Sequence, residues 1–150
     1  MAEPDHALSA SKLNVDGVGL LRAEFMIADI GMHPREAIKN KKQHIFIEKL
    51  ALDLEKFCKA FNPRPVVYRA TDFKTNEYRS LPGGKSWEPE EPNPMLGFRG
   101  AYRYIANPEV FHLELEAIKR VREKYKNLWL MIPFVRSPEE LLKIRRLVAA

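Results

Sequence analysis

The sequence is poor in cysteine and in long apolar runs, and each shortage excludes a class of protein. A single cysteine among 150 residues rules out a framework of intrachain disulfides and suits a reducing compartment, so we expect the chain to work in the cytoplasm. No apolar stretch approaches the roughly 20 residues that cross a bilayer. The acidic first residues also lack the charge pattern of a signal peptide, so we expect no membrane partner.

The sequence also lacks any long run of one charge. It carries 25 basic and 20 acidic residues, a net charge of +5, and the two signs are interleaved along the expected helices. Nucleic-acid binding needs basic residues concentrated on one face, and it predicts an affinity that falls steeply with salt. The mixed charges therefore argue against a nucleic-acid partner.

Apolar periodicity, broken by proline and glycine, divides the chain into strands and helices. The expected strands are Val18 to Phe25, Val66 to Ala70 and Leu128 to Val135. The expected helices are Pro4 to Lys12, Pro34 to about Ala60, Pro108 to Lys124, and a last one with Ser137 as its N-cap. One buried stripe is expected on the second helix, comprising Ile47, Leu50, Leu54, Phe57, Cys58 and Phe61. Strands that alternate with helices indicate an α/β fold with a parallel sheet.

Each of three apolar runs ends in an arginine, namely Arg22, Arg69 and Arg136. Ligands bind at the carboxyl ends of parallel strands, and guanidinium forks suit phosphate and carboxylate groups. The pattern therefore predicts a site for a small anion. Strand alternation places Arg69 on the face of Val67, where an arginine is costly unless it meets an anion. The alternative is structural, with Arg22 paired to Glu24 or to another carboxylate at the strand end.

A long stretch rich in proline and glycine, Thr71 to Gly100, follows the second of these arginines. Loops of this length inside a compact domain are usually functional. Asp72 at its start can hold a phosphate oxygen or orient the arginine. The string Asn93 to Gly100 holds Arg99 between two glycines that permit tight turns, although no complete phosphate-loop motif is present. Asp72 and Arg99 therefore join the candidate site.

Four blocks, in this order and spacing, resemble the PEP-utilising enzyme family. The blocks are Gly17 to Phe25, Val66 to Tyr78, Asn93 to Gly100, and Met131 to Val135. The resemblance covers nearly the whole chain. It implies that residues 1–150 are part of a (β/α)8 TIM barrel, the family's C-terminal domain that binds PEP and pyruvate, and that they supply about strands two to four with their helices.

The resemblance also implies an activity. In the family, a phosphohistidine on a separate domain passes its phosphoryl group to the enolate of pyruvate. The members that this chain resembles most make phosphoenolpyruvate, AMP and phosphate from pyruvate, ATP and water. Carried onto matching positions, Arg22 and Arg69 would grip the phosphoryl and the carboxylate or enolate oxygens of the substrate. Asp72 and Arg99 would complete the set of substrate-binding residues.

No catalytic or metal-binding residue is expected within the chain itself. The family's magnesium ligands and its catalytic cysteine are expected downstream of Ala150, and Cys58 is expected to be a buried, inert helix residue. None of the four histidines lies in the phosphohistidine context. We therefore expect a fragment of a phosphotransferase that is inactive alone, because it lacks the phosphohistidine and nucleotide-binding domains. Since an opened barrel exposes strand edges, homo-oligomers are also expected.

Two other functions stay open. The chain can be a stand-alone anion-binding or regulatory module that keeps the arginines without catalysis. It can also belong to another barrel enzyme of the pyruvate kinase or aldolase type, although the string Asn93 to Gly100 argues against this.

Overall fold

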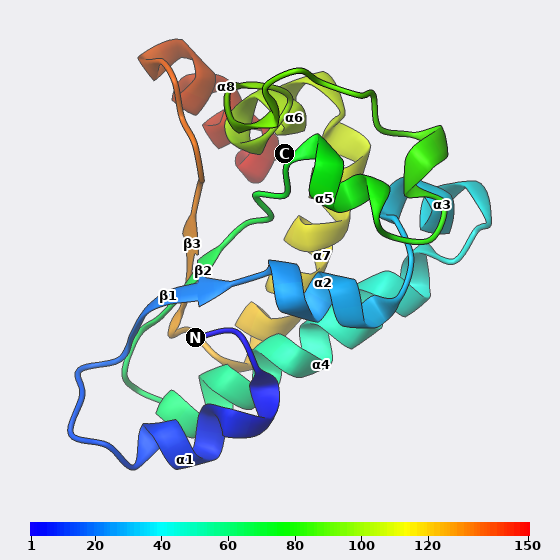
Figure 1. Ribbon diagram of the computed structural model, residues 1–150. Helices are drawn as coiled ribbons and strands as arrows, with labels where there is room; N and C mark the ends of the chain where they lie inside the picture. Colours follow the sequence, from blue (N-terminus) through cyan, green and yellow to red (C-terminus); the bar gives the residue numbers. More distant parts are fainter.

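A computed structural model describes residues 1–150 (Figure 1). Its helices and strands follow one another as η1 (Pro4–His6), α1 (Ala7–Ser11), β1 (Val18–Arg22), α2 (Glu24–Ile30), α3 (Pro34–Lys39), α4 (Gln43–Phe61), β2 (Val66–Arg69), α5 (Thr75–Arg79), η2 (Gly84–Ser86), η3 (Pro94–Leu96), α6 (Gly100–Ala106), α7 (Pro108–Lys124), β3 (Leu128–Met131) and α8 (Pro138–Ala149). No helix has both the length and the apolar character that crossing a bilayer demands.

The three strands are parallel and lie in the order β1-β2-β3, which confirms the predicted α/β class and the parallel sheet. Helices α4 and α7 pack against each other and cover one face of the sheet, on the right of the strands in Figure 1. Helix α2 lies along α4, and α6 packs on α8 near the carboxyl ends of the strands. The sheet is open rather than closed into a barrel.

The two faces of the sheet have different surroundings. On β2, Val66 and Tyr68 are buried beneath the helices, whereas Val67 and Arg69 are only half-buried on the opposite face. On β3 the same open face carries Trp129, which is 57% exposed. The prediction that Arg69 shares a face with Val67 is confirmed, but this face is not the one that the helices cover.

Helix α4 supplies much of the core. All six residues of its predicted stripe are buried, and burying each large apolar side chain contributes about 1.5–3 kcal/mol. Burial, with a smaller effect of Glu55, raises the pKa of the Cys58 thiol to about 12. The thiol is therefore neutral and unreactive near pH 7, as predicted.

The second predicted strand ends one residue early, at Arg69, and the other two end three or more residues earlier than expected. The first ends at Arg22, and Phe25 lies instead on α2, where it is 60% exposed. The third ends at Met131, because Pro133 has no N–H to donate to a ladder and Phe134 adopts a left-handed conformation with φ 51°. Arg136 therefore does not stand at a strand end.

The predicted helix from Pro34 to Ala60 is two helices. The chain turns between α3 and α4 at Lys41, whose φ is 55°, and the N–H of Lys42 donates to the carbonyl of Ala37 at 2.8 Å. The stretch Thr71 to Gly100, expected as a loop, contains α5 and two short 3-10 helices. The predicted helix Pro4 to Lys12 is the 3-10 turn η1 followed by α1, which ends at Ser11. The helix Pro108 to Lys124 and Ser137 as the N-cap of α8 are confirmed.

The backbone of Met1 extends the sheet beyond β1. Its amino group donates to the carbonyl of Leu20 at 2.7 Å, and its carbonyl accepts from the N–H of Arg22 at 2.9 Å. This is the bond pattern of a parallel neighbour. The outer edge of β1 is thus paired at one residue.

Candidate functional site

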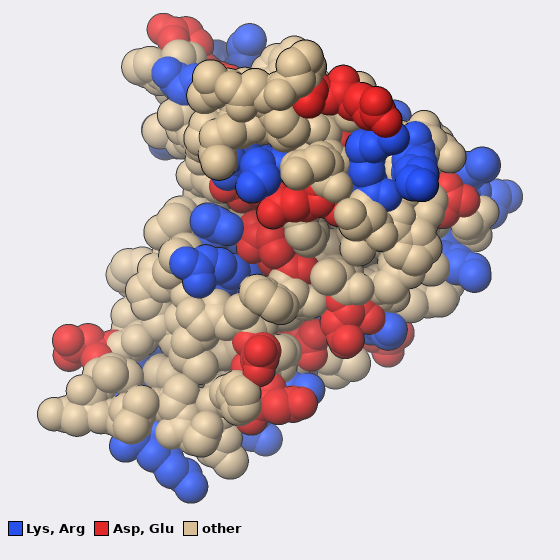
Figure 2. All heavy atoms as spheres, in the orientation of Figure 1, with Lys and Arg blue, Asp and Glu red and all other residues tan.

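Arg22 and Arg69 stand side by side at the carboxyl edge of the sheet. They are register partners on β1 and β2, so both side chains project from the same open face. Neighbouring strands lie about 4.8 Å apart, which brings two permanent positive charges together. Arg22 is exposed and makes no side-chain hydrogen bond. Basic and acidic side chains gather over this end of the strands in Figure 2.

Glu24, on the first turn of α2, holds Arg69. Its Oε1 accepts from Nη2 of Arg69 at 2.9 Å and from the N–H of Asp72 at 2.8 Å. Its Oε2, like Nε of Arg69, is buried without a partner. Buried polar atoms without partners are rare, and a ligand that reaches them is one explanation for their presence. The alternative pairing of Arg22 with Glu24 is wrong, since the carboxylate faces Arg69 instead.

Asp72 and Arg99 form a second ion pair beside the first. Arg99 donates from Nε to Oδ1 at 3.0 Å and from Nη2 to Oδ2 at 2.7 Å, while Nη1 faces the carbonyl and the sulfur of Met95. The hydrogen bonds to Asp72 raise the pKa of Arg99. Since nearly all its donors are used, Arg99 supports Asp72 and leaves Arg22 and Arg69 as the guanidinium groups open to an anion.

Phe134 lies between two guanidinium groups. The carbon atoms at their centres are 4.3 Å (Arg99) and 4.6 Å (Arg136) from the centre of its ring. Arg136 also donates to the carbonyls of Gly97 and Arg99, at 2.7 and 3.3 Å. Gly100 fits here because its φ is 60° and a Cβ would come within 2.6 Å of the Cβ of Phe134. The third arginine thus secures the string Asn93 to Gly100 instead of joining the open pair.

A buried ionic cluster anchors the segment that leads into this string. Glu88 accepts from Nη1 and Nη2 of Arg103, at 2.6 and 2.9 Å. Its Oε1 is also 2.8 Å from Nε2 of His33. Burial alone would raise the pKa of Glu88, but His33 and Arg103 outweigh it and lower that pKa below its usual 4.5. Arg103 also donates to the carbonyl of Phe98 at 2.7 Å, which links the cluster to the residue before Arg99.

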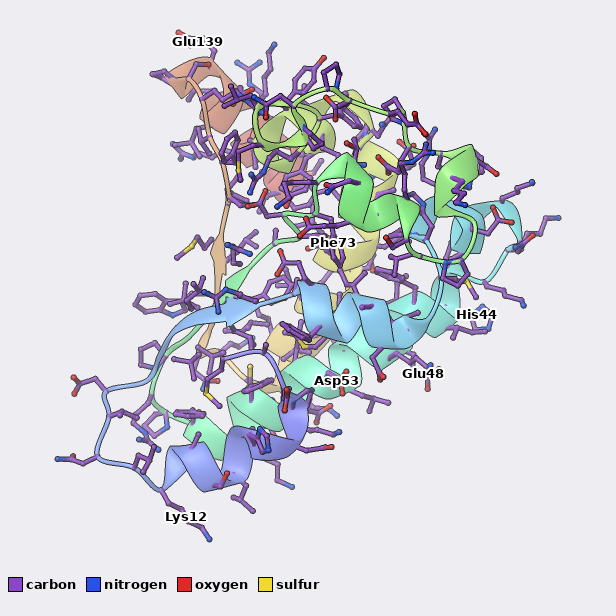
Figure 3. The ribbon with its side chains drawn as sticks, viewed as in Figure 1. Lys12, His44, Glu48, Asp53, Phe73 and Glu139 are labelled. Atoms are coloured by element: carbon purple, nitrogen blue, oxygen red, sulfur yellow. The ribbon has the colours of Figure 1, made fainter.

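Aromatic packing holds the residues after β2. Phe73, which is labelled in Figure 3, follows Asp72. Its ring packs against that of Tyr78 on α5, with 4.6 Å between ring centres. A surface cavity of about 1000 Å³ lies between α7, β3 and α8 and contains none of the four predicted residues. No group of three or more His, Cys, Asp or Glu side chains that could hold a metal ion is found in the structure.

The sequence analysis missed two carboxylates. Glu24 was considered only as a partner of Arg22, and its position two residues after that arginine carried no signal for Arg69. Glu114 is fully buried on α7 beneath Thr71. A signal for it existed, because Glu114 falls four residues after Val110 and three before Ala117, on the apolar stripe of the helix.

The fold and the site together define a parallel α/β domain with two neighbouring arginines at the carboxyl edge of its sheet. The family described as "PEP-utilising enzyme, PEP-binding domain" matches residues 1–150. The chain therefore belongs to the PEP-utilising enzyme family.

Relatives point to one branch of this family. Phosphoenolpyruvate synthase of Pyrococcus furiosus is 50% identical over 145 residues, which are 96% of this chain and 18% of that protein. The enzymes of the same name from Aeropyrum pernix and Deinococcus radiodurans are 48% and 42% identical, and the match covers 94% and 100% of this chain and 18% and 22% of theirs. The chain thus spans about a fifth of the length of the curated relatives it matches. These matches favour part of such an enzyme over a stand-alone module.

Proposed function

We propose that this chain binds phosphoenolpyruvate and pyruvate at Arg22 and Arg69, as the substrate-binding part of a phosphoenolpyruvate synthase. The observation that carries the proposal is the register pairing of the two arginines on the open face, in a chain that belongs to this family throughout. Phosphate and carboxylate each accept the parallel donors of a guanidinium group. One arginine for each end of the substrate accounts for both side chains.

Each residue of the site has a defined task in this proposal. Arg22 is free to follow the ligand, whereas Glu24 fixes the direction of Arg69 through its Nη2. Asp72, held by Arg99, closes the acidic side of the site and repels an anion placed in the wrong orientation. As charge spreads over the phosphoryl oxygens during transfer, the fixed guanidinium group of Arg69 stabilises it without having to reorganise.

The rest of the reaction lies outside the residues described. We propose that a phosphohistidine domain delivers the phosphoryl group, that ATP, pyruvate and water yield AMP, phosphoenolpyruvate and phosphate, and that the strands belong to a (β/α)8 barrel as about its second to fourth. Magnesium would be held by residues beyond this chain, and no step assigned here runs through it. A reducing compartment such as the cytoplasm suits the single buried cysteine.

Calorimetry with phosphoenolpyruvate tests the proposal. We expect binding by the wild-type protein and at least a tenfold weaker affinity for Arg22→Ala and for Arg69→Ala, because each loses a charge-assisted contact of about 1.5–3 kcal/mol. Arg145→Ala is the matched control, an exposed arginine on α8 with no part in the site. Equal affinity in all four proteins would contradict the proposal, as would no binding by the wild type.

A further inference from the structure

Glu114 is a carboxylate with no exposed surface, and it lies directly under the anion site. It projects from α7 toward the end of β2 and accepts from Tyr68 OH at 3.0 Å and from the N–H of Thr71 at 3.0 Å. The hydroxyl of Thr71 donates to it as well. No lysine, arginine or histidine donates to this carboxylate, which makes it an expensive group to bury.

These hydrogen bonds hold the chain on both sides of Arg69. Tyr68 precedes it and Thr71 comes two residues after it, and one carboxylate holds both. The contacts of Glu114 with Tyr68 and Thr71 lie on the covered side of the sheet, opposite to the face from which Arg69 projects. A shift of the backbone at Arg69 would therefore break contacts on both of its sides.

The same carboxylate takes part in a complete set of backbone hydrogen bonds. The N–H of Ala70 donates to Met131, that of Thr71 to Glu114, and that of Asp72 to Glu24. Tyr104 donates its hydroxyl to the carbonyl of Thr71. The chain leaves the sheet here, yet each of three successive N–H groups keeps an acceptor, two of them carboxylates from different helices.

Burial outweighs these donors, with a contribution from the negative charge of Glu24, and raises the pKa of Glu114 to about 7. The other titratable groups that face it are phenols: Tyr68 on β2, Tyr78 on α5 and Tyr104 on α6. A buried acid with this environment is a poor stabiliser of the fold, so its position calls for a role at the site.

We propose that Glu114 is a positioning residue for substrate binding, which sets the placement of Arg69 and Asp72 by holding Tyr68 and Thr71 on either side of the strand end. This inference rests on the proposed function, since the placement matters through the anion that Arg69 binds. Glu114 does not touch the substrate. It acts through the backbone between residues 68 and 72.

Three variants separate the positioning role from simple packing. Glu114→Gln keeps the length and the acceptor oxygen for Thr71, and its amide N–H can donate to the Tyr68 hydroxyl. Glu114→Asp is one methylene too short to reach both partners, and Glu114→Ala removes the acceptor. Val121→Ala, two turns further along α7, is the matched control for lost stability, because Val121 is buried away from the site.

Two measurements are made on each protein: the affinity for phosphoenolpyruvate by calorimetry, and amide hydrogen exchange at Asp72. We expect Glu114→Gln to bind within about threefold of the wild type, and the Asp and Ala variants to bind about tenfold more weakly, with faster exchange at Asp72. Val121→Ala should lower stability and change neither quantity at the site.

The inference is overturned if folded Glu114→Ala keeps both the affinity and the protection of Asp72. It is also overturned if Val121→Ala loses affinity to the same degree, since stability alone would then explain the effect. Failure of the wild type to bind phosphoenolpyruvate contradicts the proposed function, whereas the exchange at Asp72 still decides whether Glu114 holds the segment in place.

Discussion

Arg99 donates to both oxygens of Asp72, at 3.0 and 2.7 Å, and so joins the string before α6 to the end of β2. The two residues are 27 positions apart in the chain, and the pair is mostly shielded from solvent. Such a two-point contact fixes direction as well as distance, which a single ion pair does not. The following expectations start from this pair and its neighbours.

Arg99→Lys should weaken phosphoenolpyruvate binding roughly tenfold, because an ammonium group cannot contact both oxygens of Asp72 while facing Met95. Calorimetry measures the effect, and Arg145→Lys on α8 is the matched control. Unchanged affinity in Arg99→Lys would mean that charge alone, without the fork, is enough at this position.

Phe134 offers a test in which stability and binding separate. Phe134→Leu should weaken binding several-fold by removing the ring between the two guanidinium groups, whereas Phe134→Tyr should bind as the wild type does. Phe134→Gly should also bind weakly, yet lose less stability than other aromatic deletions, because φ 51° costs a non-glycine residue about 1–3 kcal/mol. Calorimetry and urea unfolding measure the two effects. An affinity of Phe134→Leu equal to that of the wild type would contradict this expectation.

Glu88→Ala should lower the free energy of unfolding by about 3–5 kcal/mol, since it leaves the guanidinium of Arg103 buried without its carboxylate. Urea denaturation provides the measurement. Glu90→Ala, two residues away, is the control, because its ion pair with Arg79 is solvent-exposed and screened. Similar losses of unfolding free energy in both variants would show that the buried cluster stabilises the fold no more than an exposed ion pair does.

The pH dependence of stability should carry a contribution from Glu114. Its pKa in the folded protein, about 7, exceeds the usual 4.5, so the folded state keeps a proton that the unfolded chain has released. The contribution is full below pH 4.5 and is lost as the pH rises to about 7, on the order of 3 kcal/mol. The pKa of Glu88 is lowered, so its contribution to stability is lost only as the pH falls below 4.5.

Urea unfolding of the wild type and of Glu114→Gln between pH 4.5 and 8 isolates this contribution. The difference in unfolding free energy between the two proteins should shift in favour of the glutamine variant as the pH rises. Parallel pH profiles for the two proteins would show that Glu114 titrates alike in the folded and unfolded states.

The open face of the sheet should promote self-association. Trp129 is 57% and Met131 37% exposed there, next to Val67, and apolar faces of this kind mark contact surfaces. We expect a second copy of the chain to cover them, and Trp129→Lys to lower the mass measured by light scattering. Leu52→Lys on α4, also at an exposed apolar residue, is the control. A monomeric wild type would contradict the expectation.

The sequence predicted the parts of this fold that depend on periodicity. The stripe of α4 and the starts of the three strands follow from repeated apolar spacing, which survives in any packing arrangement. Strand ends were less visible. Leu21, Ala23 and Phe25 alternate with two charged residues as they would in a half-buried strand, so the turn into α2 had no marker. The break at Lys41 was hidden as well, because a lysine occupies a conformation where glycine or asparagine is usual.

The site was predictable only in part, for a related reason. Arg22 and Arg69 could be brought together because parallel strands end at one edge, which is a rule of topology. The partners of Arg69 and Thr71 come from α2 and α7, and contacts between separate helices depend on packing that no local pattern records. Arg136 was misplaced because the proline and the left-handed Phe134 end the strand five residues before it.

The pairing of Met1 with β1 has a practical consequence for handling the protein. A residue added before Met1 would run alongside β1 toward Leu20 and Gly19, at the amino end of the strand, because the pairing is parallel. An affinity tag or a surface tether at this end therefore leads away from Arg22 and from the carboxyl edge of the sheet. Attachment after Ala150, which is exposed at the end of α8, also avoids the arginines.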